Sequence, residues 1–221
     1  CEHKEECKNG HPGFTGPKSA FVSTGYESKK LPRLLFLSLD SGSGGENPEA
    51  RLPHAVRKQE EIDSNVLGLR KNRHWYRTHE LAWYVFHKFD PNIEIQDTKS
   101  YFAHANSAKC CQNKKSRKKA DSILFKNCRK YLNGELTILA PDILISQGNE
   151  AKYAAREILD IKEQIDDFAA IAGLNEKKIF WLHTYHPNYY GGFYKQRDFD
   201  KEAKVAKGWQ KYSQMMYEFL M

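Results

Sequence analysis

The chain has 221 residues, of which 40% are hydrophobic and 13% aromatic, which is enough apolar material for one domain with a full core. It contains no stretch of about 18 apolar residues, so the sequence excludes a transmembrane helix. Thirty-five Lys and Arg residues against 28 Asp and Glu give a formal net charge of +7, which favours a polyanionic partner such as nucleic acid.

The first 30 residues combine glycine and proline with two cysteines and show little periodicity, which predicts an irregular arm. Residues 31–221 are expected to form the α/β body of the same single domain. A short apolar run at residues 34–37 predicts a buried strand. This strand leads to Asp40 and to a glycine-rich loop at residues 41–45, where polar groups are delivered to a candidate site.

Helical and strand patterns then alternate along the chain. Apolar residues at helical spacing predict an amphipathic helix over residues 75–89. Second, third and fourth strands are predicted at residues 101–104, 142–146 and 179–182, with a helical stretch at residues 149–161. This alternation predicts a three-layer α/β/α fold around a central, four-stranded, mainly parallel sheet. In such folds ligands bind at the carboxyl ends of the strands.

Several histidines and one aspartate follow these strands or lie on the helix. Asp40 can be either a turn residue or part of a site. His186, just past the fourth strand, can donate a hydrogen bond to a developing anion or can be a structural residue, and His183 has the same two interpretations. His74 and His79 are expected to be helix-face or core-edge residues, because their spacing is not that of a zinc enzyme.

Five cysteines, two of them adjacent, and no secretory signal indicate a reduced, intracellular setting, in the cytoplasm or a nucleus. Thiolates from distant segments can form one soft metal site or an iron–sulfur cluster that ties the arm to the body, or they can be unrelated free thiols. Zinc is the alternative metal, although the close Cys-x2-Cys pairs of ordinary zinc modules are absent. The candidate ligands are Cys1, Cys7, Cys110 and Cys128, which leaves Cys111 spare.

Residues 109–119 contain six basic and no acidic residues, a density suited to phosphate contacts and also to a solvated loop. Lys114, Lys115 and Lys118 are the candidate DNA contacts in this basic stretch. The glycine-rich loop at residues 42–45 could approach a phosphate, but it is neither a dinucleotide fingerprint nor a Walker loop.

Four short motifs follow the predicted strands in a fixed order. They are Leu39-Asp40-Ser41-Gly42-Ser43, Ala105-Asn106-Ser107-Ala108-Lys109-Cys110, Pro141-Asp142-Ile143-Leu144-Ile145-Ser146-Gln147-Gly148 and Thr184-Tyr185-His186-Pro187-Asn188. Their order and residue types resemble the uracil-DNA glycosylase superfamily, and most closely its iron–sulfur branch, families 4 and 5. The resemblance covers roughly residues 34–190 and the two amino-terminal cysteines.

The resemblance implies an enzyme that flips a nucleotide out of DNA and hydrolyses its N-glycosidic bond. In that role Asn106 would read the edge of the base through its amide. His186 would donate to the departing base. Asp40 would stabilise the oxocarbenium-like sugar or orient the attacking water. We expect a monofunctional glycosylase that uses water as the nucleophile and acts as a monomer.

The resemblance also implies residues for DNA and for a cofactor. The flanking phosphates would be bound by backbone and hydroxyl groups of Ser41, Gly42, Ser43 and Asn188. The cysteines Cys1, Cys7, Cys110 and Cys128 would hold a structural [4Fe–4S] cluster. The family's amino-terminal pair is Cys-x2-Cys and the chain opens at Cys1 without a methionine, so a cysteine upstream of Cys1 is an alternative first ligand.

Two kinds of base are compatible with the sequence as the substrate. The family's segment with a uracil-stacking Phe has no counterpart in residues 46–51, so uracil is the default and a bulky 5-substituted cytosine is the alternative. Such substrates correspond to base repair or to defence against modified foreign DNA. Other interpretations are a catalytically inactive DNA-binding protein of the same fold, or an unrelated metal-bearing α/β protein that binds RNA.

Overall fold

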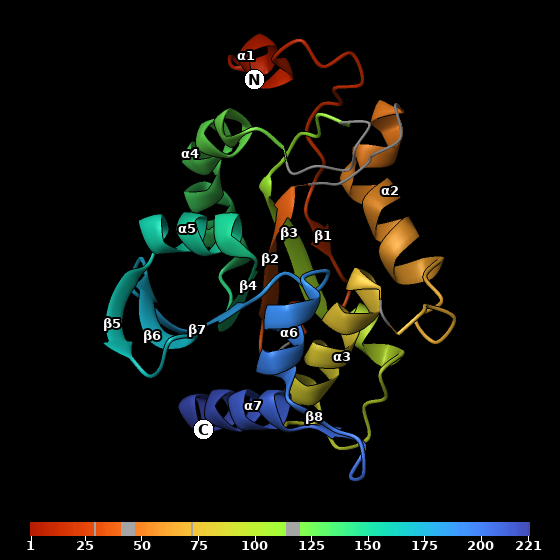
Figure 1. Cartoon of the computed structure of the whole chain (residues 1–221), viewed down its shortest axis with the longest axis vertical. Coiled ribbons are helices and arrows are strands. Elements are labelled where there is room, and N and C mark those ends of the chain that lie inside the picture. Colours follow the sequence, from red (N-terminus) through yellow and green to blue (C-terminus); the bar gives the residue numbers. More distant parts are fainter. Residues whose placement is uncertain (29, 41–46, 72, 114–119) are drawn as a thin grey trace.

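The computed structural model describes residues 1–28, 30–40, 47–71, 73–113 and 120–221 (Figure 1). Within these ranges a seven-stranded sheet runs through the molecule in the order β1-β3-β2-β4-β7-β6-β5. Its strands are β1 (Phe21–Val22), β2 (Leu34–Asp40), β3 (Phe102–Ala108), β4 (Ile143–Gln147), β5 (Asp160–Gln164), β6 (Ala169–Leu174) and β7 (Lys177–Thr184). A hairpin of β8 (Phe199–Asp200) and β9 (Val205–Ala206) lies apart from the sheet.

The four predicted strands form the parallel centre of this sheet, because β3, β2, β4 and β7 pair in parallel. The predicted three-layer α/β/α fold is confirmed, but the sheet is larger than expected. β1 pairs antiparallel with β3 at one edge, and β6 and β5 continue antiparallel beyond β7. The helix predicted over residues 149–161 ends at Ile158, because the chain turns there into the mostly exposed β5.

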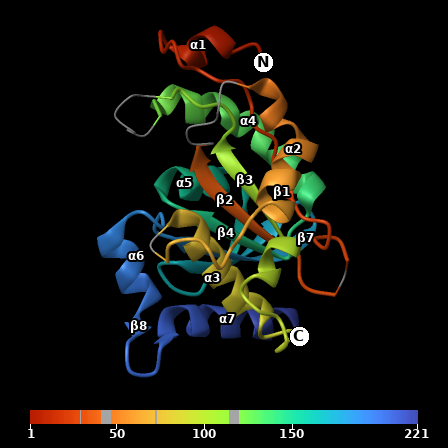
Figure 2. The same ribbon diagram turned by 90° about the vertical axis from the view of Figure 1, so that its right-hand side faces the viewer.

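Helices cover both faces of the sheet (Figure 2). One face packs against α3 (His74–Phe86), α6 (Tyr190–Arg197) and α7 (Lys207–Leu220), and the other against α4 (Ser122–Leu139) and α5 (Asn149–Ile158). Because side chains alternate along a strand, the parallel central strands supply both cores. Phe36 and Leu37, for example, lie in opposite cores, and both are fully buried.

Short elements complete the described chain: α1 (Lys4–Lys8), a 3-10 turn at Pro48–Arg51, α2 (Pro53–Arg57) with a π-helical turn at Lys58–Ile62, and a 3-10 turn at Asp97–Ser100. The predicted irregular arm therefore holds a helix and a strand. It is anchored to the body by the Thr15–Cys111 bridge and by Tyr26, whose hydroxyl donates to the Leu139 carbonyl at 3.1 Å. No helix in the described ranges is long and apolar enough to cross a membrane.

Candidate active site

The carboxyl ends of β2, β3 and β7 bring together the three residues that the sequence proposes for catalysis. In the parallel register of β2 and β3, Ser38 lies opposite Asn106. Asp40 follows Ser38 by two positions and so shares its face of the sheet. His186 follows the end of β7, near enough for the charge of Asp40 to raise its pKa. One edge of the sheet thus carries a carboxylate, an amide and an imidazole.

Asn106 is a buried amide whose side chain has no partner among the residues that the structure describes. The residue is 6% exposed, and its side chain forms no hydrogen bond to any of them. The donor and acceptor of Asn106 are therefore suited to a ligand that enters from the strand ends.

His186 is arranged as a neutral hydrogen-bond donor. The backbone N–H of Asn188 donates to its Nδ1 atom at 3.2 Å, which assigns the proton of the neutral ring to Nε2. Burial lowers the pKa of His186, and the nearby Asp40 opposes this shift only in part. An uncharged imidazole that presents an Nε2–H group suits a site where negative charge develops.

His74 is the first residue of α3 and is half-buried, as expected of a helix-face or core-edge residue, and its ring also contacts His186. At the start of α3, its imidazole stacks on that of His186 with ring centroids 5.1 Å apart and planes 12° apart. Burial lowers the pKa of His74 to about 3, so the ring is neutral. The signal that the sequence lacked is the placement of α3 over the strand ends, which brings residues far apart in the chain into contact.

The other two histidines have internal partners. His79 is fully buried, deeper than the expected helix-face or core-edge position, and its Nδ1 atom lies 2.7 Å from the Thr98 hydroxyl. His183 lies 3.4 Å from Ser146 Oγ, and burial lowers its pKa to about 4. The geometry therefore gives His183 a structural place inside the sheet and leaves His186 as the imidazole beside Asp40.

A buried polar chain beneath the site was missed by the sequence analysis. Ser38 Oγ donates to Gln147 Oε1 at 2.8 Å, Gln147 Nε2 donates to Thr78 Oγ1 at 3.3 Å, and His104 Nε2 lies 2.9 Å from Ser38 Oγ. These contacts link β2, β3, β4 and α3. A usable signal was present, because Ser38 and Asp40, like His104 and Asn106, are polar residues at alternate positions of otherwise apolar strands.

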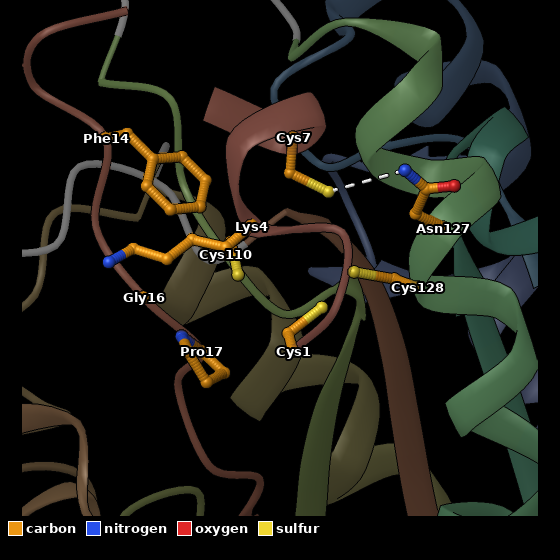
Figure 3. Close-up of a pocket in the computed structure, with 9 residues that line it drawn as sticks. All are labelled: Cys1, Lys4, Cys7, Phe14, Gly16, Pro17, Cys110, Asn127 and Cys128. Carbon is orange, nitrogen blue, oxygen red and sulfur yellow. Dashed lines mark hydrogen bonds between the residues drawn. The ribbon is translucent and has the colours of Figure 1, made fainter. Parts of the chain in front are cut away.

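The four proposed ligand cysteines line one cavity of about 150 Å³ (Figure 3). Cys7 comes from α1, Cys110 follows β3, Cys128 lies on α4, and Cys1 opens the chain. None of them forms a disulfide. Burial raises the pKa of the Cys110 thiol to about 11, and the neighbouring Cys128 and Cys7 add to the shift. Four thiols in an apolar cavity fit the ligand chemistry of an iron–sulfur cluster.

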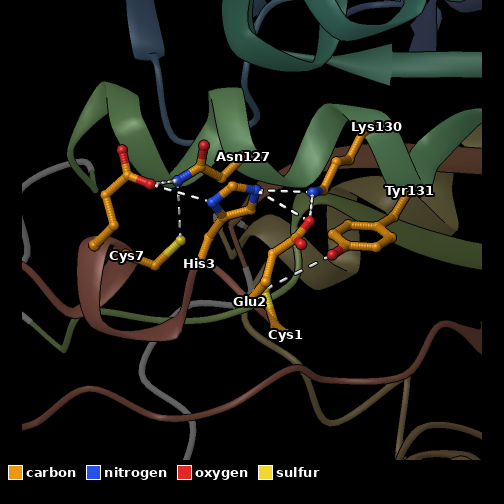
Figure 4. A network of polar contacts seen from close by, with 8 residues as sticks. Cys1, Glu2, His3, Cys7, Asn127, Lys130 and Tyr131 are labelled. Carbon is orange, nitrogen blue, oxygen red and sulfur yellow. Dashed lines mark hydrogen bonds and ion pairs between the residues drawn. The ribbon is translucent and has the colours of Figure 1, made fainter.

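Three of these sulfur atoms accept hydrogen bonds, and Figure 4 shows those to Cys7 and Cys1. Asn127 Nδ2 donates to Cys7 at 3.6 Å, the Tyr131 hydroxyl to Cys1 at 3.9 Å, and the Lys109 backbone N–H to Cys128 at 3.3 Å. Donors of this kind surround metal-bound thiolates and tune them. The arm is held against the same side of α4 by an ion pair between Glu2 and Lys130.

Cys111 does not line this cavity and has other partners. Its sulfur donates to Asn113 Oδ1 at 3.1 Å, and its backbone pairs with Thr15. Within the described part of the chain, no three His, Cys, Asp or Glu side chains converge to hold a single metal ion.

Most of the proposed DNA contacts cannot be placed. Ser41, Gly42, Ser43, Lys114, Lys115 and Lys118 lie outside the described residues. Asn188 is exposed and adjoins His186 through its backbone. Lys109, the first basic residue of the stretch at 109–119, forms an ion pair with Glu135 and is only 13% exposed in its side chain, so it is not a free phosphate contact.

The family comparison covers both the strand ends and part of the cysteine site. The family described as Uracil DNA glycosylase superfamily matches residues 17–211, a range that includes Asp40, Asn106 and His186. None of the curated proteins compared with the chain matches it. Since the match extends over most of the chain, this protein belongs to the uracil DNA glycosylase superfamily.

Proposed function

We propose that this protein is a monofunctional DNA glycosylase that removes a flipped-out uracil or another modified pyrimidine from DNA. Membership of the superfamily indicates DNA glycosylase activity in general. The observation that carries the specific proposal is the 6% exposed amide of Asn106, unpartnered among the described residues, on the same sheet edge as His186 and Asp40. We further propose that it acts as a monomer, in base repair or in defence against modified DNA.

Asn106 would recognise the base. Its amide offers an NH2 donor and a carbonyl acceptor, which match O4 and N3–H of uracil. Flipping the nucleotide out of the stack costs a few kcal/mol, and hydrogen bonds between the base and the Asn106 amide help to offset that cost.

His186 and Asp40 would share the chemistry of bond breaking. When the bond between C1′ and the base nitrogen breaks, its electron pair stays on the base, and the Nε2–H of His186 donates to the base oxygen that gains this charge. The sugar becomes positively charged, and the Asp40 carboxylate stabilises it and orients the water that adds to C1′. The proton that this water loses neutralises the anionic base, so the products are the free base and a C1′ hydroxyl. Such preorganised groups contribute roughly 10²- to 10³-fold each in comparable sites.

Two substrate classes remain for the same site. Uracil is favoured by the family and by the fit of the Asn106 amide. A 5-substituted cytosine is the second candidate, because the amide can be flipped to present its acceptor to an N4 amine and the family's stacking Phe has no counterpart in residues 46–51. Comparing base release from uracil, hypoxanthine and 5-substituted cytosine in single- and double-stranded DNA would separate them.

The cysteine cavity is the proposed cofactor site. We propose that Cys1, Cys7, Cys110 and Cys128 hold a [4Fe–4S] cluster, with a zinc ion as the alternative. The supporting observations are the four thiols around one cavity and the hydrogen bonds to three of their sulfur atoms. When bound, the group would cross-link the amino-terminal arm to α4 and to the end of β3. Residues 109–119 follow that strand, and we propose that their lysines contact DNA phosphates together with the loop at residues 41–43.

A further inference from the structure

The turn that carries His186 connects the sheet to α6. β7 ends at Thr184, and the turn His186-Pro187-Asn188 bridges to α6 at Tyr190. Within the turn, the hydrogen bond from the Asn188 N–H to His186 Nδ1 selects the tautomer. Water can compete for that bond because it is exposed to solvent. The orientation of the imidazole therefore also depends on the residues that pack against the turn.

Helix α3 contacts this turn with a buried guanidinium. Arg77 is 3% exposed, its Nη1 donates to the Pro187 carbonyl, and its Nη2 donates to the Tyr194 hydroxyl at 2.6 Å. The guanidinium also lies 5.2 Å from the centre of the Phe193 ring. Burying a charge is costly unless its N–H groups are paired, and a planar guanidinium holds its acceptors in a fixed geometry. Arg77 therefore ties the turn and α6 to α3.

The same helix contacts the imidazole directly, one turn earlier. His74 precedes Arg77 by three residues, so both side chains leave the same side of α3. The His74 ring stacks on His186 with planes 12° apart, which restricts rotation of the His186 ring. Since burial lowers the pKa of His74 to about 3, the ring that stacks on the neutral His186 is itself uncharged.

We propose that α3 clamps the turn at these two points and that His74 and Arg77 are positioning residues for His186. The inference rests on the proposed function, because it concerns the same imidazole. Neither residue is expected to touch the substrate. They act by keeping the Nε2–H of His186 aimed at the departing base, and small misplacements of such a group can cost about 10²-fold in rate.

The test compares variants by 15N NMR of labelled histidines and by single-turnover base excision. His74→Leu keeps bulk without the flat ring, and His74→Phe restores the ring. Arg77→Met removes the donors, and Arg77→Lys keeps the charge without the planar fork. His186→Gln assigns the signals of His186. The matched control is Arg197→Met, because Arg197 also links α3 to α6, through Glu80 at 2.8 and 2.5 Å, without contacting the turn.

In the wild type, His186 should show a protonated Nε2 and an unprotonated Nδ1 at neutral pH. His74→Leu and Arg77→Met should give a mixture of tautomers and a roughly 10- to 100-fold lower excision rate with unchanged affinity for DNA. His74→Phe should keep the wild-type signal, and Arg197→Met should lower stability only. If Arg77→Met does not fold, His74→Leu and Arg77→Lys carry the comparison.

The clamp would be overturned if folded His74→Leu and folded Arg77→Met both kept the wild-type NMR signals and excision rates. If Arg77→Met does not fold, Arg77→Lys takes its place in this comparison. Equal loss of the tautomer in Arg197→Met would also overturn the clamp, since the effect would then be general loosening. A wild-type protein that releases no base would contradict the proposed function, while the tautomers of the same variants would still decide whether α3 positions His186.

Discussion

Asp40 and His186 interact across the sheet although their strands are not neighbours. β2 carries Asp40, β7 leads to His186, and β4 lies between them. The carboxylate charge raises the pKa of His186, while burial, the larger effect, lowers it. The balance keeps the imidazole neutral near a negative charge. This is the electrostatic arrangement that leaving-group departure from a positive sugar requires.

Asp40→Asn should therefore lower the pKa of His186 further. The amide removes the negative charge that favours the imidazolium and leaves the burial that opposes it, so the sign of the shift is downward. The measurement is an NMR titration of His186 in the wild type and the variant, with His183 as the internal control. An unchanged or raised His186 pKa in the variant would mean that the Asp40 charge does not favour the imidazolium of this ring.

Cys111→Ser should leave the cysteine site loaded, while Cys110→Ser and Cys128→Ser should empty it. Anaerobically prepared wild type is expected to be brown, with absorbance at about 400 nm and about four irons per chain. Cys128→Ser should also lose solubility, because metal binding contributes folding energy. Colourless, zinc-loaded wild type would favour the alternative metal. If Cys111→Ser empties the site while Cys110→Ser retains it, the ligand assignment is wrong.

Stability should fall as the pH is lowered from 7 to about 4.5, through buried histidines. The pKa values of His74 and His79 are lowered to about 3 and that of His183 to about 4. In this interval the unfolded chain binds protons that the folded chain does not, so stability rises with pH. Each such histidine contributes up to about 1.4 kcal/mol per pH unit.

His79→Gln isolates one of these histidines, because it removes an ionisable ring whose hydrogen-bond partner is Thr98 and not a proposed catalytic residue. Urea unfolding at several pH values should give this variant a lower stability at pH 7 and a shallower decline toward acid. Equal slopes in the wild type and the variant would show that His79 ionises alike in the folded and unfolded chains.

Replacing Lys114, Lys115 and Lys118 together with Ala should weaken binding to all DNA sequences alike and flatten the dependence of binding on salt. Each lysine that stops neutralising a phosphate lowers the slope of log K against log salt by about one on duplex DNA. Lys109→Ala is the matched control, because Lys109 is paired with Glu135 and should change the slope little. An unchanged slope in the triple variant would remove this stretch from the DNA path.

The parallel strands were predictable, whereas the antiparallel edge was not. Residues 34–37 and 143–146 form continuous apolar or small-residue runs, the pattern of strands buried on both faces. β6 is alanine-rich and β5 is almost entirely polar, so neither carries a strand signal, and β5 owes its conformation to pairing with β6.

The candidate site was likewise predictable from the sequence only in part. Asp40, Asn106 and His186 follow strand ends, so the sequence order alone placed them at one edge of the sheet. The contacts of His74 with His186 and of Arg77 with Pro187 join residues more than a hundred positions apart. They depend on where α3 lies over the sheet, and no local pattern in a single sequence encodes that position.

The most informative measurement is alkali cleavage of DNA after incubation with the wild type, Asn106→Ala and Asp40→Ala. The DNA panel contains uracil, hypoxanthine or 5-substituted cytosine at one position. The wild type should release uracil or a modified pyrimidine and leave an alkali-labile abasic site. Both variants should fold and bind DNA, yet excise at least about 10²-fold more slowly. Tight DNA binding without release of any base, or robust excision that survives both replacements, would contradict the assignment of this site.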